Sequence, residues 1–575
     1  MLKTLASSIR GYRVRSVLAS VFVIIEVLFE VYIPFLMADI INIGIANSDV
    51  DFIIRRGALM IGMAVCSLIF GVLCARCAVV ASCGFAKNLR KRLFDRVTDF
   101  SFANTDKFTT ATLITRLTTD TSNVQQAFQM IIRMMVRSPI MLVAATIMAM
   151  RINTELAIVF AFALPALIIA LGAIAFTTFP KFKILLKRVD SMNAEVQENL
   201  IATRVVKAFV REEHENEQFL KSAEAVRAAQ VKAEAGIALG MPIAQFVLYA
   251  CMIAICYLGG TKIIAGDMLT GDLMSFISYV GQILSSVLMM TMGLVTLVMT
   301  RASASRICDV LNEQPDITSE GADGSLTVAD GSISFKDVYF SYSKDAENPT
   351  LEDIGLTIRS GEHIGIIGGT GSGKTSLVQL IPRLYDVTGG SVSVAGHDVR
   401  EYTPEHLREG VAMVLQKNVL FSGTIKDNLR WGNQNATDEE LIFACKAAAA
   451  HDFIMGFENG YDTVLGQGGV NLSGGQKQRL CIARALVKKP RIIIMDDSTS
   501  AVDTATDESI RRALDEQLSG TTTITIAQRI TSVMDMDRII VMDDGRIIEC
   551  GTHDELMERG GIYREVYNSQ QKGVA

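Results

Sequence analysis

The sequence lacks the features that mark several common protein classes. No basic stripe stands out among its 575 residues, and the formal net charge is −6, so no nucleic-acid partner is expected. The C-x-x-C pair Cys74/Cys77 has no second pair to complete a zinc site, and we interpret it as part of an apolar helix. The basic first residues lead into an apolar stretch that is too long for a signal peptide and has no obvious cleavage site. We therefore expect this stretch to stay in the protein as a membrane anchor.

Charge is also missing from long parts of the first half. A helix needs about 20 apolar residues to cross a hydrocarbon core of roughly 30 Å, and six stretches approach this length. They are residues 17–43, 57–80, 130–150, 156–179, 236–261 and 273–300, of which the last three contain no charged residue. Six spans leave both chain ends on one side. Lys and Arg are concentrated after the second and fourth spans, so the positive-inside rule predicts that both termini are cytoplasmic.

The two connections on this inner side are long, polar and almost free of Gly and Pro. Residues 81–129 and 180–235 favour helical hairpins that would project about 40 Å from the bilayer. A disordered loop is the alternative, but apolar residues recur at helical spacing in "NLIATRVVKAFV", residues 199–210. We thus expect a transmembrane domain over 1–308, a polar linker over 309–332, an α/β domain over 333–568 and a frayed tail over 569–575.

The clearest motif lies in the α/β domain. "GIIGGTGSGKTS" fits G-x-x-x-x-G-K-[ST] and stands between an apolar strand and a helical stretch, as a phosphate-binding P-loop requires. Backbone N–H groups of such a loop surround phosphates, a lysine reaches the β- and γ-phosphates, and a hydroxyl binds Mg²⁺. The predicted nucleotide-binding residues are Gly368, Gly369, Thr370, Gly371, Ser372, Gly373, Lys374, Thr375 and Ser376, with Thr375 as a Mg²⁺ ligand.

Two adjacent carboxylates end a second buried strand, "RIIIMDDSTSAVD". P-loop domains hold Mg²⁺ through an acidic residue at this point, and Asp496 directly follows four apolar residues. We therefore predict that the metal is the counter-ion of Asp496. The role of its neighbour, Asp497, depends on the family.

The motif "NLSGGQKQRL" at 471–480 resembles the signature of ABC transporter ATPases. Six spans, long helical loops and a C-terminal ATPase domain resemble an exporter-type half-transporter over nearly the whole chain. The resemblance implies an α-helical six-span transmembrane domain with long cytoplasmic helical loops, followed by an α/β P-loop ATPase domain of the ABC type. It also implies that Tyr342 stacks on adenine, that Gln416 lies at the loop between the ATPase lobes and binds Mg²⁺, and that Ser500 to Asp503 form the D-loop.

The resemblance further implies a head-to-tail dimer of ATPase domains. Each ATP then lies between the Walker motifs of one chain and the signature of the other, so that the partner's nucleotide is bound by Ser473, Gly474, Gly475 and Gln476. The 101–113 region and the segment Thr203 to Phe209 resemble coupling segments that transmit ATPase closure to the membrane helices. A second half-transporter and a lipid bilayer are the partners implied.

The chain departs from its family at the catalytic positions. Active members have Glu directly after the Walker B Asp, whereas Asp497 is one methylene shorter, which retracts the carboxylate by about 1.5 Å. Loss of a general base costs about 10² to 10⁴ in rate. The switch histidine is replaced by Gln528, and Gln467 replaces the usual Glu before the signature, which is itself intact.

Both losses at one site predict a heterodimer whose degenerate site uses this chain's Walker motifs and whose partner carries Glu and His. Two alternatives remain: a homodimer in which Asp497 and Gln528 suffice, and an ATP-binding regulatory subunit with little turnover. The absence of an organellar targeting segment and the half-transporter size favour a bacterial cell membrane.

The transported substrate is expected to be amphipathic, either drug-like or a lipid. Glu26 and Glu30 lie four residues apart on one face of the first span, where carboxylates are costly and often face a cavity. They are candidate cavity residues for cationic substrates, with interface placement or hydrogen bonding to neighbouring helices as the plainer explanation. Arg133 and Arg137 in the third span are expected to extend toward lipid headgroups.

Overall fold

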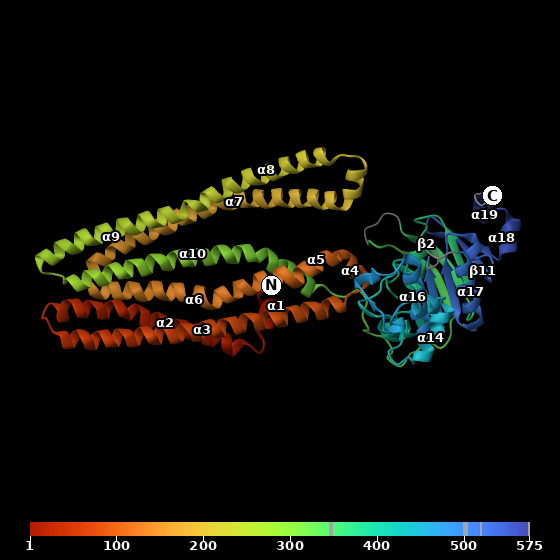
Figure 1. The fold of residues 1–575 in the computed structure, drawn as a ribbon, viewed down its shortest axis with the longest axis horizontal. Helices are drawn as coiled ribbons and strands as arrows, with labels where there is room; N and C mark the ends of the chain where they lie inside the picture. The colour runs from red at the N-terminus through yellow and green to blue at the C-terminus, as the bar shows by residue number, and fades with distance from the viewer. Residues whose placement is uncertain (344–348, 498–503, 518–519, 573–575) are drawn as a thin grey trace. The chain divides into compact units, whose positions relative to one another are not determined.

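The computed structural model describes residues 1–343, 349–497, 504–517 and 520–572, and these fall into two compact units. The first unit contains residues 1–98 and 110–313, and the second contains residues 99–109 and 314–575 (Figure 1). The short segment 99–109 therefore belongs to the second unit, although its neighbours on both sides in the sequence belong to the first.

The first unit is built from helices. In the part of the chain that the structure describes, six helices are long and apolar enough to cross a membrane, which confirms the six-span expectation. The elements are α1 (Leu2–Ala6), η1 (Ser7–Ile9), α2 (Arg13–Asp39), η2 (Ile40–Ile45), α3 (Val50–Thr98), α5 (Thr110–Thr115), η3 (Arg116–Asp120), α6 (Thr121–Ile152), α7 (Thr154–Ala208), α8 (Glu212–Ala238), α9 (Gly240–Ala265) and α10 (Thr270–Asn312). The fifth expected span begins at the end of α8 and continues into α9.

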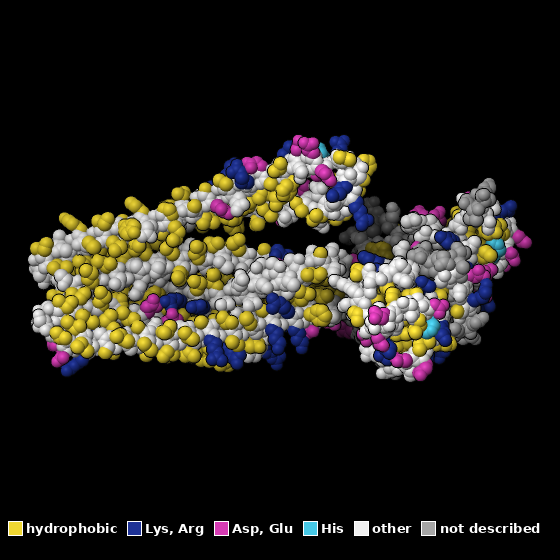
Figure 2. All heavy atoms as spheres, in the orientation of Figure 1, with side chains coloured by type: hydrophobic (Ala, Val, Ile, Leu, Met, Phe, Trp, Pro, Cys, Tyr) yellow, Lys and Arg dark blue, Asp and Glu magenta, His cyan; other side chains and the backbone are white. Residues whose placement is uncertain are grey.

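The long connections of the first unit are helical as well. Helices α3 and α7 contain 49 and 55 residues, and at 1.5 Å per residue they extend about 70–80 Å, which is far more than a bilayer needs. Helices α7 and α8 lie side by side as a hairpin, in which Asn199 Nδ2 donates to Glu215 Oε2 at 2.6 Å (Figure 1). Hydrophobic side chains dominate the surface where α2 turns into α3 and α9 turns into α10. Charged side chains gather toward the tip of the α7–α8 hairpin (Figure 2). The helices α7 and α8 cover nearly all of residues 180–235, which contradicts the disordered-loop alternative.

The second unit contains two main sheets. The six-stranded sheet has the order β12-β11-β3-β10-β9-β6 and is parallel except for β12, while an antiparallel sheet has the order β2-β1-β4-β5. The strands are β1 (Ile333–Phe340), β2 (Leu351–Ile358), β3 (His363–Gly368), β4 (Gly389–Val394), β5 (His397–Asp398), β6 (Val411–Val414), β7 (Gly423–Thr424), β8 (Val464–Leu465), β9 (Ile492–Asp496), β10 (Thr522–Ile526), β11 (Arg538–Asp543) and β12 (Arg546–Gly551).

Helices cover the sheets of the second unit and enclose apolar cores. The five residues of β9 are all buried, which matches a central parallel strand read from a continuous apolar run. The helices are α4 (Phe102–Phe108), α11 (Lys374–Leu380), α12 (Pro404–Gly410), α13 (Ile425–Arg430), α14 (Asp438–Ala447), α15 (His451–Met455), η4 (Gly460–Asp462), η5 (Gln467–Gly469), α16 (Gly474–Val487), α17 (Thr504–Gln517), η6 (Ile530–Ser532), α18 (His553–Arg559) and α19 (Ile562–Lys572).

Two expected boundaries need correction. Helix α10 continues to Asn312, four residues into the expected linker, because Val310 and Leu311 are buried and extend its apolar face. The tail was expected to fray from 569, but α19 continues through Lys572. The physical reason is that Gln570 forms hydrogen bonds with the backbone of residues 528 and 530.

Candidate nucleotide site

The predicted catalytic and phosphate-binding residues follow three adjacent parallel strands. In the register of the sheet, Ile526 of β10 lies opposite Ile366 of β3 on one side and Asp496 of β9 on the other. The loops that begin after β3, β9 and β10 therefore leave the same edge of the sheet. Carboxyl ends of parallel strands are the usual ligand-binding edge of an open α/β sheet.

The loop after β3 has the shape of a P-loop. Gly368 has φ +153° and Gly373 has φ +91°, and a Cβ on Gly368 would lie 2.1 Å from the carbonyl oxygen of Met542. Only glycine fits there. The ammonium group of Lys374 donates to the carbonyl oxygens of Gly368 at 2.9 Å and Gly369 at 2.6 Å. The cation thus lies across the loop, where phosphate oxygens would replace the carbonyls.

Asp496 and Thr375 lie together beneath this loop. The Thr375 hydroxyl donates to Asp496 Oδ1 at 3.1 Å, and Asp496 is only 2% exposed. Burial raises the pKa of Asp496, while the hydrogen bond from Thr375 lowers it in part. A hard cation prefers such oxygen ligands and would relieve the cost of the buried charge, so the donor set fits Mg²⁺.

Two of the three departures from the family pattern, Asp497 and Gln528, are in direct contact. Gln528 Nε2 donates to Asp497 Oδ2 at 2.8 Å, and Gln416 also forms a side-chain hydrogen bond with Asp497. Asp497 has φ +47°, a conformation that is rare for residues other than glycine and often found at functional sites. Burial raises the pKa of Asp497, and the two amides oppose that rise. The structure therefore brings Asp497, Gln528 and Gln416 together.

Tyr342 lies beside the helix that follows the P-loop. Its hydroxyl forms a 2.8 Å hydrogen bond with Ser376 Oγ, and the residue is 52% exposed, which leaves room for a planar ligand. The ring of Tyr385 packs edge-on against it, with centroids 5.1 Å apart. The predicted adenine-stacking residue is thus supported from behind by a second aromatic residue that the sequence analysis did not identify.

Tyr385 also contacts α4, which belongs to the predicted coupling segment 101–113. The Tyr385 hydroxyl donates to Asp106 Oδ2 at 2.7 Å, and its ring centroid lies 6.0 Å from that of Phe102. Asn104 Nδ2 donates to the carbonyl oxygen of Gln314 at 3.1 Å. These contacts explain why residues 99–109 group with the second unit.

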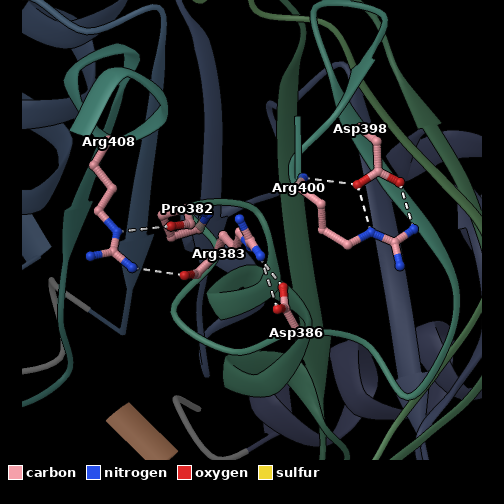
Figure 3. Close-up of polar contacts among 6 residues, drawn as sticks. All are labelled: Pro382, Arg383, Asp386, Asp398, Arg400 and Arg408. Atoms are coloured by element: carbon pink, nitrogen blue, oxygen red, sulfur yellow. Dashed lines mark hydrogen bonds and ion pairs between the residues drawn. The ribbon is translucent and has the colours of Figure 1, made fainter. Parts of the chain in front are cut away.

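The loop that carries Tyr385 is fixed by arginines (Figure 3). Arg408 donates to the carbonyl oxygens of Pro382 at 3.1 Å and Arg383 at 2.8 Å, and Arg383 Nε donates to Asp386 Oδ1 at 2.8 Å. Arg383 has φ +49° and is buried. Because α11 begins at the P-loop lysine and ends directly before this loop, the arginines hold Tyr385 in a fixed position relative to the phosphate-binding loop.

The signature motif opens helix α16. Ser473 is its N-cap: Gln476 N donates to Ser473 Oγ at 3.3 Å, and Ser473 N donates to Gln476 Oε1 at 2.9 Å. Ser473 and Gly474 are exposed, so the first turn of α16 is accessible to an anion from another molecule. The predicted D-loop residues, Ser500 to Asp503, lie outside the described residues.

In the first unit, Glu26 and Glu30 have a partner that the sequence analysis did not assign. Arg137 forms ion pairs with both carboxylates, which links α2 to α6. The expectation that Arg137 extends toward headgroups was therefore wrong, because two carboxylates lie within its reach. Glu26 is 14% exposed and Gly71 of α3 lies against it, where a Cβ would come within 3.3 Å of the carboxyl carbon.

Comparison with known proteins gives the same assignment over the whole chain. Residues 17–287 match the family described as ABC transporter transmembrane region, and residues 351–500 match the family described as ABC transporter. The chain is 36% identical over 564 residues to the "Uncharacterized ABC transporter ATP-binding protein YfiB" of Bacillus subtilis (strain 168), covering 98% of each chain. It is 32% identical over 489 residues to the "ATP-dependent lipid A-core flippase" of Syntrophus aciditrophicus (strain SB), covering 84% of this chain and 80% of that one.

A solved structure of a bacterial Atm1-family ABC exporter with ATP bound superimposes with a TM-score of 0.82, at 25% identity and over 98% of each chain. The long hairpins, the P-loop edge of the sheet and the signature helix therefore belong to a known architecture. This chain is a membrane protein of the ABC transporter family, an exporter-type half-transporter whose ATP-binding domain couples ATP hydrolysis to transport.

Proposed function

We propose that this chain is one subunit of a heterodimeric exporter and that the site on its own Walker motifs is degenerate. The observation that carries the proposal is the 2.8 Å hydrogen bond between Gln528 and Asp497, which places both departures from the family pattern on one pair of atoms. The amide of Gln528 and that of Gln416 occupy acceptor positions of the Asp497 carboxylate, which leaves fewer of them to orient water. The site would then retain bound ATP and hydrolyse it slowly.

Mg²⁺ would be held by Thr375, Asp496 and Gln416, and when bound it would neutralise charge on the phosphates. Lys374 would exchange the loop carbonyls for phosphate oxygens, and Tyr342 would stack on the adenine ring. The backbone N–H groups of Gly369 to Ser376 would surround the phosphates. These roles rest on the close approach of Thr375 to Asp496 and on the shape of the loop.

A second half-transporter would complete both sites. The exposed Ser473 and Gly474, with the partly buried Gly475 and Gln476, would bind ATP held on the partner's Walker motifs. Ser500 and Asp503 would act as D-loop residues of the dimer. Further support comes from the tip of the α7–α8 hairpin, where Phe209 is 74% and Val210 is 83% exposed. Apolar side chains at a polar hairpin tip suit burial against another chain.

Closure of the ATPase domains would move the membrane helices through α4. This helix contacts the ATPase domain through Tyr385 and Asp106, and it is continuous in sequence with α3 and α5. The end of α7, within the segment Thr203 to Phe209, would act in the same way on the partner. The cavity would then turn from the cytoplasmic side to the outside.

The substrate would be amphipathic, either drug-like or a lipid, and the protein would lie in a bacterial cell membrane with both termini in the cytoplasm. A relative carries the name lipid A-core flippase, which supports a lipid-like substrate. Glu26 and Glu30 would face the cavity as a site for cationic groups. With Arg137 they form a triad of net negative charge, so one carboxylate charge is not balanced within it.

ATP turnover of the purified chain in lipid bilayers tests the proposal. The chain alone should bind ATP but hydrolyse it slowly, and turnover should rise when a partner with the family Glu and His is added. Lys374→Ala is the control that removes ATP binding.

A functional homodimer is the second candidate, because Asp497 directly follows strand β9 and its carboxylate is hydrogen-bonded to Gln528. Robust activity of the chain alone that is lost in Asp497→Asn or Gln528→Ala would establish the homodimer and exclude a degenerate site. An ATP-binding regulatory subunit is the third candidate. It would bind ATP and show little turnover at its own Walker motifs, even in a dimer in which Ser473 completes the partner's site.

A further inference from the structure

The C-terminal helix α19 is anchored on the ATPase domain close to residues 528–531, the switch segment, which begins with Gln528. Tyr563 is fully buried, and its hydroxyl lies 2.6 Å from His553 Nδ1. The same apolar cluster contains Ile530 and Val533, which follow Gln528 in the chain. The helix therefore has a fixed position relative to the residues after β10.

Gln570, in the last turn of α19, holds the switch segment at two points. Its Nε2 donates to the carbonyl oxygen of Gln528 at 2.8 Å, and its Oε1 accepts from Ile530 N at 2.9 Å. The side-chain amide of Gln570 thus forms hydrogen bonds with the backbone on both sides of Arg529. Such a two-point contact fixes both the position and the direction of a short segment.

Residues on both sides of Gln528 and Arg529 are fixed by other contacts: Ala527 N donates to the carbonyl oxygen of Ile366 at 3.1 Å, and Ile530 is buried. Strand β10 ends at Ile526, and the side chains of Gln528 and Arg529 are exposed. A further hydrogen bond reaches Thr531, whose carbonyl oxygen accepts from Arg511 Nη1 at 3.0 Å. The Gln528 side chain in turn donates to Asp497. Two successive hydrogen bonds therefore connect Gln570 of α19, through Gln528, to the carboxylate after β9.

We propose that Gln570 is a positioning residue for Gln528, so that the C-terminal helix controls the nucleotide site through this one side chain. The inference rests on the proposed function, because it assigns Gln528 to the nucleotide. It assigns a task to a segment that the sequence alone gives as a frayed tail. It also makes the site sensitive to anything that displaces α19, including a truncation.

The test compares Gln570→Ala with Gln571→Ala in the full-length protein in lipid nanodiscs. Gln571 is the next residue on the same helix and is exposed, so its substitution controls for changes in helix propensity and composition. Prebound, γ-labelled ATP is followed to separate hydrolysis from release. Hydrogen exchange at the Ile530 amide reports directly on the lost hydrogen bond.

In Gln570→Ala we expect hydrolysis of bound ATP to accelerate by about threefold to tenfold, because the Gln528 amide can then move away from the Asp497 carboxylate. We also expect release to accelerate and the Ile530 amide to exchange faster. Gln571→Ala should match the wild type in all three. Gln570→Glu keeps the acceptor for Ile530 N and replaces the donor with a charge. It should leave that amide protected while still altering ATP hydrolysis or release.

Two outcomes would overturn the inference. If the wild type binds ATP and Gln570→Ala matches Gln571→Ala in both rates, Gln570 does not position the switch residue and the proposed function stands. A wild type that neither retains nor hydrolyses ATP would refute the proposed function, and this inference with it. Unchanged unfolding temperatures in the variants would show that any effect is local.

Discussion

Lengthening the carboxylate at position 497 should increase ATP turnover if the site is weakened by reach. In Asp497→Glu the added methylene advances the carboxylate by about 1.5 Å. A well-placed general base contributes about 10² to 10⁴ in rate. However, Gln528 Nε2 is only 2.8 Å from the Asp497 carboxylate, so the longer side chain meets that amide. We therefore expect Asp497→Glu alone to raise kcat by only about tenfold, which is less than a well-placed base supplies.

The full increase in kcat should need substitutions at both position 497 and position 528. Gln528→His removes the amide that occupies the space, and the double variant should exceed the product of the single effects. Residues in contact commonly couple by 0.5–3 kcal/mol, so a coupling of about 1 kcal/mol, or about fivefold in kcat, is the expected size. Phosphate release from the full-length chain in nanodiscs, at saturating ATP and Mg²⁺, measures all four proteins of the cycle.

Asp543→Glu is the matched control, because Asp543 is an exposed residue at the end of strand β11 of the same sheet. It should leave kcat unchanged. The reasoning would be refuted if the wild type already turns over ATP rapidly and Asp497→Glu brings no increase. Additive effects of the two substitutions would show that the contact between them has no influence on catalysis.

Three further outcomes follow from the structure. Burial raises the pKa of Asp496 above its ordinary value, so its ionised form destabilises the ATP-free fold. Asp496→Asn should then unfold at a higher temperature than the wild type at neutral pH; the gain should fade as pH falls through the raised pKa of folded Asp496 and vanish below about pH 3, where the unfolded carboxyl is protonated as well. Ser473→Ala should destabilise α16 by about 1 kcal/mol and reduce turnover of the dimer, without weakening labelled-ATP binding to this chain's own Walker motifs. Arg137→Ala should lower the free energy of unfolding in nanodiscs by roughly 1–3 kcal/mol, and adding Glu26→Gln and Glu30→Gln should recover most of it; a loss that the two Gln substitutions leave unchanged would exclude charge as its cause.

The parts of the molecule that could be predicted depend on local patterns. Apolar runs define membrane helices wherever they occur, because the bilayer imposes the same length on each of them. The P-loop could be predicted for a similar reason, since its glycines serve the backbone of the loop itself. Asp496 belongs to this class too: a buried strand that ends in a carboxylate at the ligand edge of the sheet can be read directly from its neighbours.

The parts that could not be predicted depend on contacts between distant residues. Arg137 lies more than 100 residues from Glu26, and its pairing depends on how α6 is rotated against α2. The contact of Tyr385 with Asp106 depends on α4 packing against the ATPase domain. Gln570 stands in a polar C-terminal segment whose composition suggests disorder, and only the position of α19 gives it a partner.

The two departures from the family pattern are better understood as one change than as two. Gln528 has its backbone held by Gln570, so its amide cannot retreat far from the Asp497 carboxylate. A Glu at position 497 would then compete for space with the amide, and a His at position 528 would face a carboxylate that is one methylene too short. Either single reversion leaves a mismatched pair. If the site is weakened as proposed, a single substitution should therefore recover only part of the rate, and full activity should need changes at both positions.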